Sequence, residues 1–555
     1  MLISLAGLYS KVLNDRLIEV TEMHKLLGEI QQGFRKGRCG ADNNFVLDTI
    51  MWKARASKKP VHMSFIDIAK AYDTVNRDIL WKKLSKLGFS GEFLSTIKSL
   101  YTDDSVDCLA NGLSTRPVYL RRGLRQGCAL SPLLFALYIM DVGNDINLSQ
   151  LGFMVGGVCV SGLLFADDLV IVARSAAGLK SLLSLVKVGF DKLKLTISVE
   201  KSQVISPLDD DWEVTDPAGN VVLSLEQVEL YKYLGTWTYN TMYRTSVEKQ
   251  KHCVKTAHKY KSSCIHVSKL GPDVVDVVLC TWSNVAIPAI LTGCEMIPFS
   301  ETHIVEIERV QAQVAKFALG VSSSSPNICA QTELGLKTFR QLLYERQLKF
   351  YFRVLYLPED RWVHQAMLEH LSGLWRSTYS SYICSIRSRL GLFSAPHVPR
   401  VWKKSIYDHF IMEANAAISS HSWVMPIDSL SRSSYVCESE WSTVITQFKL
   451  GVEGLGDKQP RTGHFRKPFC PVCPVNVENS GIHMLFTCGS LAKLRAETGI
   501  SSYMNVCLLK GKPLDEIYRL FLNGYDSNLN PVSVPDYLQR GRCMSDMRSL
   551  WLSKW

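Results

Sequence analysis

Three aspartates interrupt strand-like apolar runs in the first third of the chain, and this placement constrains the fold more than any other feature. Asp67 ends one such run, and Asp167 and Asp168 separate two others, 158–165 and 169–173. The second arrangement predicts a β-hairpin that carries two acids at a tight turn. Buried carboxylates are costly unless a cation compensates for their charge. We therefore expect the three acids to bind divalent ions, because hard cations prefer carboxylate oxygens.

Taken one at a time, these acids also fit ordinary structural roles. The Asp167-Asp168 pair suits a plain hairpin turn, and Asp67 suits a strand end or a helix cap. With 555 residues and 46% hydrophobic content, the chain is long enough for several domains with sizeable cores. Its net charge of +11 suits a polyanionic partner, although many basic proteins bind no nucleic acid. Composition alone therefore leaves the function open.

The motifs around the acids carry a resemblance to a known family. Segment 67–72 resembles motif A of the reverse transcriptase palm, and Phe165-Ala166-Asp167-Asp168 resembles motif C. Between them, segment 122–135 resembles motif B in the form found in LINE-type (non-LTR) retrotransposons. The motifs follow one another in the family's order over roughly 100 residues, which is far more specific than any one of them. Segments 32–38, 195–202 and 233–235 resemble the fingers motif, motif D and the primer-grip motif E.

The resemblance implies an α+β right-hand polymerase fold, with a palm built on an antiparallel sheet. A mainly helical C-terminal region with a small zinc knuckle would follow. The expected domains are partial fingers and palm (1–240), a helical thumb (241–360), a C-terminal helical connector (361–460), a CCHC zinc knuckle (461–490) and a C-terminal tail (491–555).

Catalytic roles follow from the resemblance, residue by residue. Asp67, Asp167 and Asp168 would hold two Mg²⁺ ions, and Lys201 of motif D would act as a general acid for the leaving pyrophosphate. The alternative for Lys201 is an ordinary surface lysine. Asp73 is expected to cap the following helix rather than bind metal.

The nucleotide pocket would come from motifs A and B and the fingers. Tyr72 matches the steric-gate position, where an aromatic ring packs against the place of a ribose 2′-hydroxyl; the alternative is core packing. Arg35 and Arg38 are candidate triphosphate contacts, because guanidinium forks fit phosphate oxygens; the alternative is a solvated basic loop. The remaining expected pocket residues are Ile68, Gln126 and Gly127.

A basic helical face would hold nucleic acid after the palm. Lys251, Lys255 and Lys259 recur every four residues, with Lys249, His252 and Lys261 nearby. In a thumb, this face would contact phosphates in a salt-dependent manner; the alternative is a solvated face. The expected primer grip consists of Tyr233, Leu234 and Gly235.

A cysteine and histidine cluster near the end has the spacing of a structural zinc site. Its ligands would be Cys470, Cys473, His483 and Cys488. Arg466 and Lys467 precede it as a basic approach, so the knuckle is expected to bind nucleic acid rather than catalyse. The other cysteines are irregularly spaced, which favours a reducing compartment, nuclear or cytoplasmic.

Local patterns predict several helices. Segment 78–87 is expected to form a helix ended by Gly88, and Ser131 is expected to cap another with Pro132 at its first position. A stripe of Ile307, Val310, Val314 and Phe317, ended by Gly320, predicts a third helix. The apolar segment 274–294 contains polar residues and is expected to form a pair of core helices rather than a membrane span.

The expected partners are an RNA template, a DNA primer or target and dNTPs, with two Mg²⁺ and one Zn²⁺; the sequence leaves the oligomeric state open. Met1 lies within a fingers motif whose preceding Arg-Pro is missing, so we expect an N-terminally truncated copy or a partial gene model, with impaired activity. One alternative is a non-catalytic nucleic-acid-binding relic. Another is a nucleotidyl transferase or RNA polymerase with a related palm, which Tyr72 argues against.

Overall fold

The computed structural model divides into two compact units. Unit 1 consists of residues 1–249, 296–298 and 350–382, and unit 2 of residues 250–295, 299–349 and 383–555. The structure describes residues 4–102, 104–107, 109–110, 113–114, 116–239, 242–268, 274–372, 377–392, 399–419, 491–500, 503–504, 507, 512, 514–522, 539–542, 544 and 546.

A six-stranded sheet forms the centre of unit 1, in the order β11-β12-β10-β1-β9-β8. Neighbouring strands are antiparallel except for the parallel pair β10 and β12. The strands are β1 (His62–Ile66), β8 (Gly162–Phe165), β9 (Asp168–Ala173), β10 (Gln203–Ile205), β11 (Trp212–Thr215) and β12 (Val221–Gln227). The expected palm sheet is therefore present in unit 1, with one parallel pairing that the sequence did not predict.

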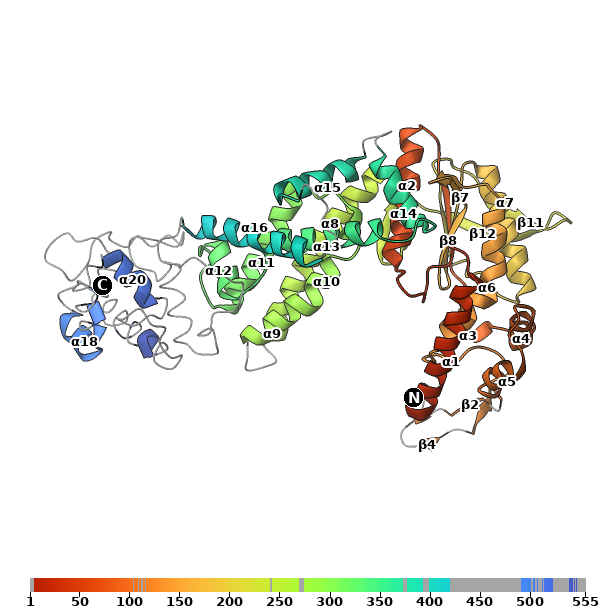
Figure 1. Cartoon of the computed structure of the whole chain (residues 1–555), viewed down its shortest axis with the longest axis horizontal. Helices are drawn as coiled ribbons and strands as arrows, with labels where there is room; N and C mark the ends of the chain where they lie inside the picture. Colours follow the sequence, from red (N-terminus) through yellow and green to blue (C-terminus); the bar gives the residue numbers. More distant parts are fainter. Residues whose placement is uncertain are drawn as a thin grey trace. The chain divides into compact units, whose positions relative to one another are not determined.

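Strands β1 and β9 have almost entirely buried side chains, because helices pack against the sheet. Every residue of β1 is buried, and so is every residue of β9 after Asp168. Helix α7 (Ala176–Lys192) contacts both strands and also α6 (Ser131–Leu148) (Figure 1). The buried face of α7 repeats at helical spacing: Leu179, Leu182, Leu183, Val186 and Phe190. Ser175 starts this helix by accepting a hydrogen bond from the backbone N–H of Gly178.

Helices and short hairpins complete unit 1 around the sheet. The helices are α1 (Ser4–Met23), α2 (Gly40–Ala56), α3 (Ala71–Thr74), α4 (Arg77–Lys86), α5 (Gly91–Ser99) and α14 (Trp362–Leu371). Paired ribbons are formed by β2 (Ser105–Val106) with β5 (Val118–Tyr119), β3 (Leu109–Ala110) with β4 (Leu113–Ser114), β6 (Phe153–Val155) with β7 (Val158–Val160), and β13 (Leu230–Tyr233) with β14 (Thr236–Tyr239).

Unit 1 includes a segment that returns to it from much later in the chain. Residues 350–382 belong to this unit, and their helix α14 packs on α2 and β6. We call residues 350–382 the returning segment. The expected boundary between thumb and connector, at 360/361, falls inside it.

Unit 2 is helical in its described residues. Its elements are α9 (Val274–Thr281), the π-helix η2 (Trp282–Ala286), α10 (Ile287–Ile290), the 3₁₀ helix η3 (Cys294–Met296, shared with unit 1), α11 (Glu301–Ala318), α12 (Asn327–Glu333), α16 (Pro399–Ser419), α18 (Ala492–Glu497) and α20 (Leu514–Leu522). Helices α8 (Met242–Val267), α13 (Phe339–Leu355) and α15 (Thr378–Arg389) run across the boundaries between the units.

Two expectations for unit 2 need correction. Segment 274–290 is one continuous helical run of α9, η2 and α10 rather than a pair of helices, because the polar residues face outward within a helix and do not break it. In α11, Ile307, Val310 and Val314 are buried as expected, but Phe317 is 37% exposed. In the described part of the chain, no helix has the length and apolar character needed to cross a membrane.

Two expected helix caps also differ from the structure. Ser131 is the first residue of α6 instead of its N-cap, because its hydroxyl donates to the backbone carbonyl of Arg125 at 2.6 Å. Asp73 lies within α3 and does not cap the next helix. Asn76 caps α4 instead, accepting a hydrogen bond from the Ile79 N–H at 3.0 Å. The helix expected at 78–87 is confirmed with a shift of one residue at each end.

Candidate active site

Two neighbouring strands bring the three predicted acids to the same end of the sheet. Strands β1 and β9 are antiparallel, and their last aligned pair is Ile66 opposite Leu169. Continuing this register by one residue sets Asp67 across from Asp168, on the same face of the sheet. Asp167 precedes Asp168 in the turn between β8 and β9. The hairpin expected from the sequence is present, with a turn of two residues, Ala166 and Asp167.

The electrostatics of this cluster reflect negative charges gathered in a half-buried place. Burial first, and then the charges of Asp167 and Asp67, raise the pKa of Asp168 to about 6. Burial and the charge of Asp67 also raise the pKa of Asp167. Lys201 lies beside the cluster, with its Nζ 3.6 Å from Asp67 Oδ2, but its side chain is 72% exposed. Such clustered carboxylates fit a bound cation, which would relieve their repulsion.

The side-chain oxygens of the three acids belong to the carboxylate class that Mg²⁺ prefers. Among the described residues, no group of three or more histidine, cysteine, aspartate or glutamate side chains is placed so that it could hold a metal ion, and this includes the three aspartates. Mg²⁺ is commonly held by one or two carboxylates, together with water and substrate phosphate oxygens. The strand register and the raised pKa of Asp168 agree with that mode of binding.

Tyr72 joins motif A to motif B beside the acids. Its ring stacks on Phe135 of α6, with centroids 5.2 Å apart and planes at 14°. The Leu124 N–H donates to the Tyr72 carbonyl at 2.8 Å. Burial, and then the charge of Asp167, raise the pKa of Tyr72 to about 12. The tyrosine is thus half-buried and neutral over the physiological range, which suits both a steric gate and core packing.

The other expected pocket residues differ in exposure. Gln126 is exposed, and its Nε2 donates to Asp73 Oδ1 at 3.3 Å. Gly127 has φ +80 and open space where a Cβ would stand, so a side chain is disfavoured there by backbone conformation and not by crowding. Ile68 is 2% exposed and forms a β-bridge with Ile197, so a nucleotide would meet its backbone instead of its side chain.

A basic pocket of about 570 Å³ lies between motifs A and B, and the sequence analysis did not identify it. Its base is rigid, because the buried Asp104 accepts hydrogen bonds from Arg77 at 2.7 Å and from Arg125 at 2.9 Å. The Arg121-Arg122 doublet directly before Gly123 was the available sequence signal. The pocket's charged lining residues are Lys70, Asp73, Arg77, Asp104, Arg121, Arg122 and Arg125.

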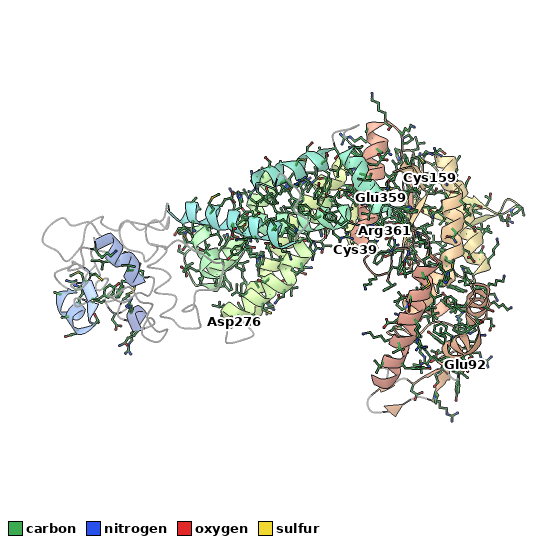
Figure 2. All side chains as sticks on the ribbon, viewed as in Figure 1. Cys39, Glu92, Cys159, Asp276, Glu359 and Arg361 are labelled. Atoms are coloured by element: carbon green, nitrogen blue, oxygen red, sulfur yellow. The ribbon has the colours of Figure 1, made fainter. Side chains whose placement is uncertain are left out.

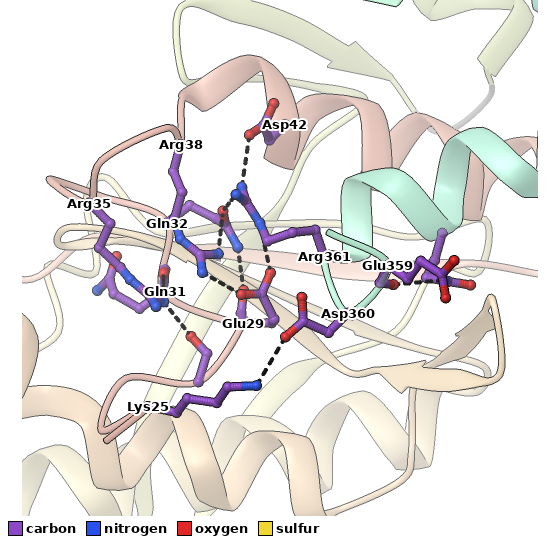
Figure 3. A network of polar contacts seen from close by, with 12 residues as sticks. Lys25, Glu29, Gln31, Gln32, Arg35, Arg38, Asp42, Glu359, Asp360 and Arg361 are labelled. Atoms are coloured by element: carbon purple, nitrogen blue, oxygen red, sulfur yellow. Dashed lines mark hydrogen bonds and ion pairs between the residues drawn. The ribbon is translucent and has the colours of Figure 1, made fainter. Parts of the chain in front are cut away.

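The two fingers arginines are engaged in ion pairs. Arg35 is 8% exposed and bonds to both carboxylate oxygens of Glu22, at 2.7 and 2.8 Å. Arg38 pairs with Glu29 at 2.5 Å, and Arg361 of the returning segment also pairs with Glu29, at 3.1 Å (Figure 3). This arrangement differs from the solvated basic loop that was the alternative. The triphosphate role of Arg35 and Arg38 stays a prediction.

Some of the residues expected to contact nucleic acid are exposed, and others are buried. Lys251, Lys255 and Lys259 are exposed along one face of α8, whereas Lys249 is buried against Asp48. In motif E, Leu234 and Gly235 form the turn between β13 and β14, both with positive φ. Tyr233 is 2% exposed, and its hydroxyl accepts from Asn43 Nδ2 at 3.2 Å. Burial raises the pKa of Tyr233.

The expected zinc knuckle lies outside the described residues. This applies to all four candidate ligands, Cys470, Cys473, His483 and Cys488, and to the basic residues Arg466 and Lys467. The knuckle therefore stays a prediction from the sequence.

Sequence reasoning also missed Gln31, which precedes the segment 32–38 singled out as the fingers motif. It is 2% exposed, and its side-chain amide bonds to the backbone of Ala166, next to Asp167. A doublet of glutamines before Gly33 was the only local signal, and it does not reveal a partner 135 residues away.

Comparisons with known proteins find relatives of the N-terminal part of the chain. Residues 1–238 match the family model described as "Reverse transcriptase (RNA-dependent DNA polymerase)". The Pol polyprotein of the type-1 retrotransposable element R2 from Nasonia vitripennis is 28% identical over 198 residues, 36% of this chain and 19% of that protein. Its counterpart from Popillia japonica is 26% identical over 241 residues, 42% of this chain and 33% of that protein.

Other similar proteins include further mobile elements and one solved structure. The RNA-directed DNA polymerase of the mobile element jockey from Drosophila funebris is 24% identical over 176 residues, 32% of this chain and 19% of that protein. A solved structure of Candida albicans telomerase with a TWJ fragment of telomeric RNA has a TM-score of 0.35 and 12% identity, covering 69% of this chain and 58% of that one.

These matches define the class of the N-terminal part of the chain. Residues 1–238 are a reverse transcriptase domain. More particularly, the domain is similar to the reverse transcriptases of non-LTR retrotransposons, since these relatives are Pol polyproteins of the retrotransposable element R2. The matched segments span 19% and 33% of the length of the two R2 relatives.

Proposed function

We propose that this chain extends the 3′-hydroxyl of a primer with dNTPs, copying an RNA template in a Mg²⁺-dependent reaction. The observation that carries the proposal is the strand register that sets Asp67 across from Asp168, with Asp167 in the adjoining turn. Two carboxylates from separate strands, next to a third, form the donor set that the two-metal reaction uses. Reverse transcriptases in general use Mg²⁺, and the domain match extends over all three acids.

Five residues would act at the reacting atoms or at the sugar of the incoming nucleotide. Asp67, Asp167 and Asp168 would hold the metal ions, which when bound supply activation of the primer hydroxyl and neutralisation of the triphosphate. Lys201, beside Asp67, would give a proton to the departing pyrophosphate. The ring of Tyr72, fixed against Phe135, would exclude a ribose 2′-hydroxyl.

Other residues would contact the incoming nucleotide, the template and the primer. Because Arg35 and Arg38 are held in ion pairs, the exposed cations for phosphate oxygens would come from Arg121 and Arg122, which line the basic pocket. Gln126 and Gly127 would border the incoming nucleotide. The exposed lysines of α8 would contact the duplex backbone, and the hairpin of Tyr233, Leu234 and Gly235 would support the primer end.

Primer extension tests the proposal. The full-length chain is incubated with a poly(rA) template, an oligo(dT) primer, dTTP and Mg²⁺. We expect extended products with Mg²⁺ and none after chelation by EDTA. Intact RNA binding without any metal-dependent product would instead support the alternative, a nucleic-acid-binding protein that does not catalyse.

Substitution of Tyr72 tests its role in choosing the sugar. Tyr72→Ala removes the ring, so the preference for dTTP over UTP should fall by at least roughly tenfold in kcat/KM, because an emptied pocket no longer excludes the extra hydroxyl. Tyr72→Phe keeps the ring and should retain the preference. Equal selectivity in Tyr72→Ala and the unaltered protein would leave only core packing for this residue.

A further inference from the structure

The turn that carries the catalytic acids adopts an unusual backbone conformation. Ala166 occupies the first position of the two-residue turn between β8 and β9, with φ +61. A residue with a Cβ disfavours this left-handed region, and glycine, asparagine or aspartate is the usual choice in such hairpins. The conformation persists only when the surroundings hold it in place. The residue in question stands directly before Asp167 and Asp168.

The side-chain amide of Gln31 supplies that hold. Its Oε1 accepts a hydrogen bond from the Ala166 N–H at 3.0 Å, and its Nε2 donates to the Ala166 carbonyl at 3.2 Å. One side chain therefore bonds to both polar backbone atoms of the left-handed residue. The same Oε1 accepts from the Gly33 N–H at 2.8 Å, which fixes the amide in its own loop.

The loop of Gln31 is built to approach the turn closely. A Cβ on Gly33 would lie 2.2 Å from the Ala166 nitrogen, so no other residue fits there without moving the turn. The backbone also pairs with β8, since the Gln32 N–H donates to the Leu164 carbonyl at 2.9 Å and the Leu164 N–H donates to the Ile30 carbonyl at 2.8 Å. These contacts hold the loop beside the turn, where the Gln31 side chain reaches Ala166.

Arg35 fixes the loop from its far side. Its Nη1 donates to the carbonyls of Gly28 and Gln31, at 2.8 and 2.9 Å, while its Nε and Nη2 pair with Glu22 of α1. Figure 3 shows Gln31 and Arg35 within the network that also contains Glu29 and Arg361. Arg361, which is labelled in Figure 2, bonds to Asp42 of α2 at 3.3 Å. The support of the turn thus extends from the fingers motif to the returning segment within unit 1.

We propose that Gln31 is a positioning residue, whose amide fixes the Ala166 turn and thereby the direction of the Asp167 and Asp168 carboxylates. The role deepens the proposed polymerase function and rests on it. The side chain of Gln31 bonds to Ala166 and Gly33, so it would act on the acids through the turn. Loss of the amide frees the turn to relax, and the acids then present their oxygens to metal ions less often in the required arrangement.

The first measurement follows the turn itself and needs no metal. Gln31→Met removes both hydrogen bonds to Ala166 and the one from the Gly33 N–H, and it keeps the side-chain length. Hydrogen exchange by mass spectrometry or NMR should show the Ala166 amide exchanging at least tenfold faster than in the unaltered protein. Gln347→Met is the matched control, because Gln347 is also fully buried but lies in α13 of unit 2. The control should leave exchange at Ala166 unchanged.

The second and third measurements follow the acids. Mn²⁺, used as a spectroscopic probe of the divalent sites, should bind about tenfold more weakly to Gln31→Met than to the control. In primer extension, kcat should fall about 100-fold, while the KM for dTTP changes less than threefold. Because a smaller folded fraction would also lower the apparent kcat at an unchanged KM, kcat is calculated per folded molecule, with the folded fraction taken from circular dichroism of the same sample.

A second variant keeps the test decisive if Gln31→Met does not fold. Gln31→Glu keeps the acceptor for the Ala166 and Gly33 N–H groups and loses the donor, so its exchange, Mn²⁺ affinity and kcat should lie between those of the unaltered protein and Gln31→Met. Unchanged exchange at Ala166, or unchanged Mn²⁺ affinity in a folded variant, would overturn the proposal. If the unaltered protein makes no DNA, the polymerase proposal fails, but the exchange and Mn²⁺ measurements still decide the role of Gln31.

Discussion

The sequence predicts phosphate contacts both for the fingers arginines, Arg35 and Arg38, and for three lysines of α8, yet the two groups differ in burial. Arg35, Arg38 and Arg361, the arginine cluster, have side chains that are 5%, 8% and 8% exposed and are paired with acids. Lys251, Lys255 and Lys259, the lysine stripe, are exposed on one helix face. Charge density alone would assign phosphate binding to both. Burial separates a cluster that holds the fold together from one that is available to a polyanion.

The comparison shows how one protein distributes positive charge between support and binding. The arginine cluster joins α1, the fingers motif and the returning segment behind the turn that carries the acids. Guanidinium groups suit this task, since each offers several donors in a rigid plane. Flexible ammonium groups on an exposed helix suit contacts with the phosphate backbone of a nucleic acid, which do not depend on the base sequence. The following predictions separate the two roles.

The largest expected effect is on stability, from the arginine cluster. Arg361→Met removes ion pairs to Glu29 and Asp42, whose side chains are 19% and 2% exposed. Because the acids stay behind, the free energy of unfolding should fall by about 3 kcal/mol. Chemical denaturation of the purified protein measures it.

Lys25→Met is the matched control for that experiment. It also removes an ion pair to the returning segment, with Asp360, but the two side chains are 80% and 60% exposed. The expected loss is below about 1 kcal/mol. Equal losses in the two variants would mean that burial does not distinguish these pairs.

The next effect in size is a pH dependence from a buried histidine in the returning segment. Burial lowers the pKa of His370 to about 4. The unfolded chain takes up this proton near pH 6.5 and the folded one only near pH 4, so stability is fully present above pH 6.5 and is lost as the pH falls to 4, by about 3 kcal/mol in total. Thermal unfolding of His370→Gln should show a weaker decline over that window. The exposed His24→Gln is the control and should decline like the unaltered protein.

The smallest effect on folding, and the largest on salt dependence, belongs to the lysine stripe. Changing all three lysines to alanine should lower the slope of log affinity against log salt by about 2 to 3, since each phosphate contact contributes nearly one unit. Stability should change by less than about 0.5 kcal/mol per site. Fluorescence anisotropy with an RNA–DNA duplex measures the slope.

A triple variant elsewhere controls for net charge. Lys11, Lys58 and Lys59 are exposed in unit 1, and their replacement by alanine removes the same total charge. The salt slope should then stay within about half a unit of the original. An equal drop in both triple variants would assign the binding to overall charge and not to the stripe.

The sequence predicts those parts of the fold that depend on the spacing of apolar residues within a short segment. The hairpin around Asp167 and Asp168 follows from two apolar runs that flank a two-residue turn, and the α11 stripe follows from helical spacing. Asp67 was placed with these acids through the order of motifs. Its neighbour across the sheet, Asp168, is about 100 residues away and is set by the pairing of β1 with β9.

Other features depend on partners far along the chain that no local pattern reveals. Arg38 looks like a solvated residue until Glu29 and the returning segment enclose it. The role of Gln31 depends on its hydrogen bonds to Ala166, which the sequence does not reveal. Ser131 is the first residue of its helix and not the cap, because its hydroxyl donates to the Arg125 carbonyl. Weak patterning after residue 360 also hid the return of residues 350–382 to unit 1. Tertiary contacts decide each of these cases.

The most direct test of the central claim is Asp167→Asn in primer extension with Mg²⁺. An amide of the same shape cannot supply the anionic oxygen that the metal needs, so DNA synthesis should fall at least roughly 1,000-fold while the unfolding curve stays close to the original. Asp78→Asn, at the exposed start of α4, is the matched control and should retain synthesis. Synthesis by Asp167→Asn within a few-fold of the unaltered protein would contradict the assignment of these acids to metal binding.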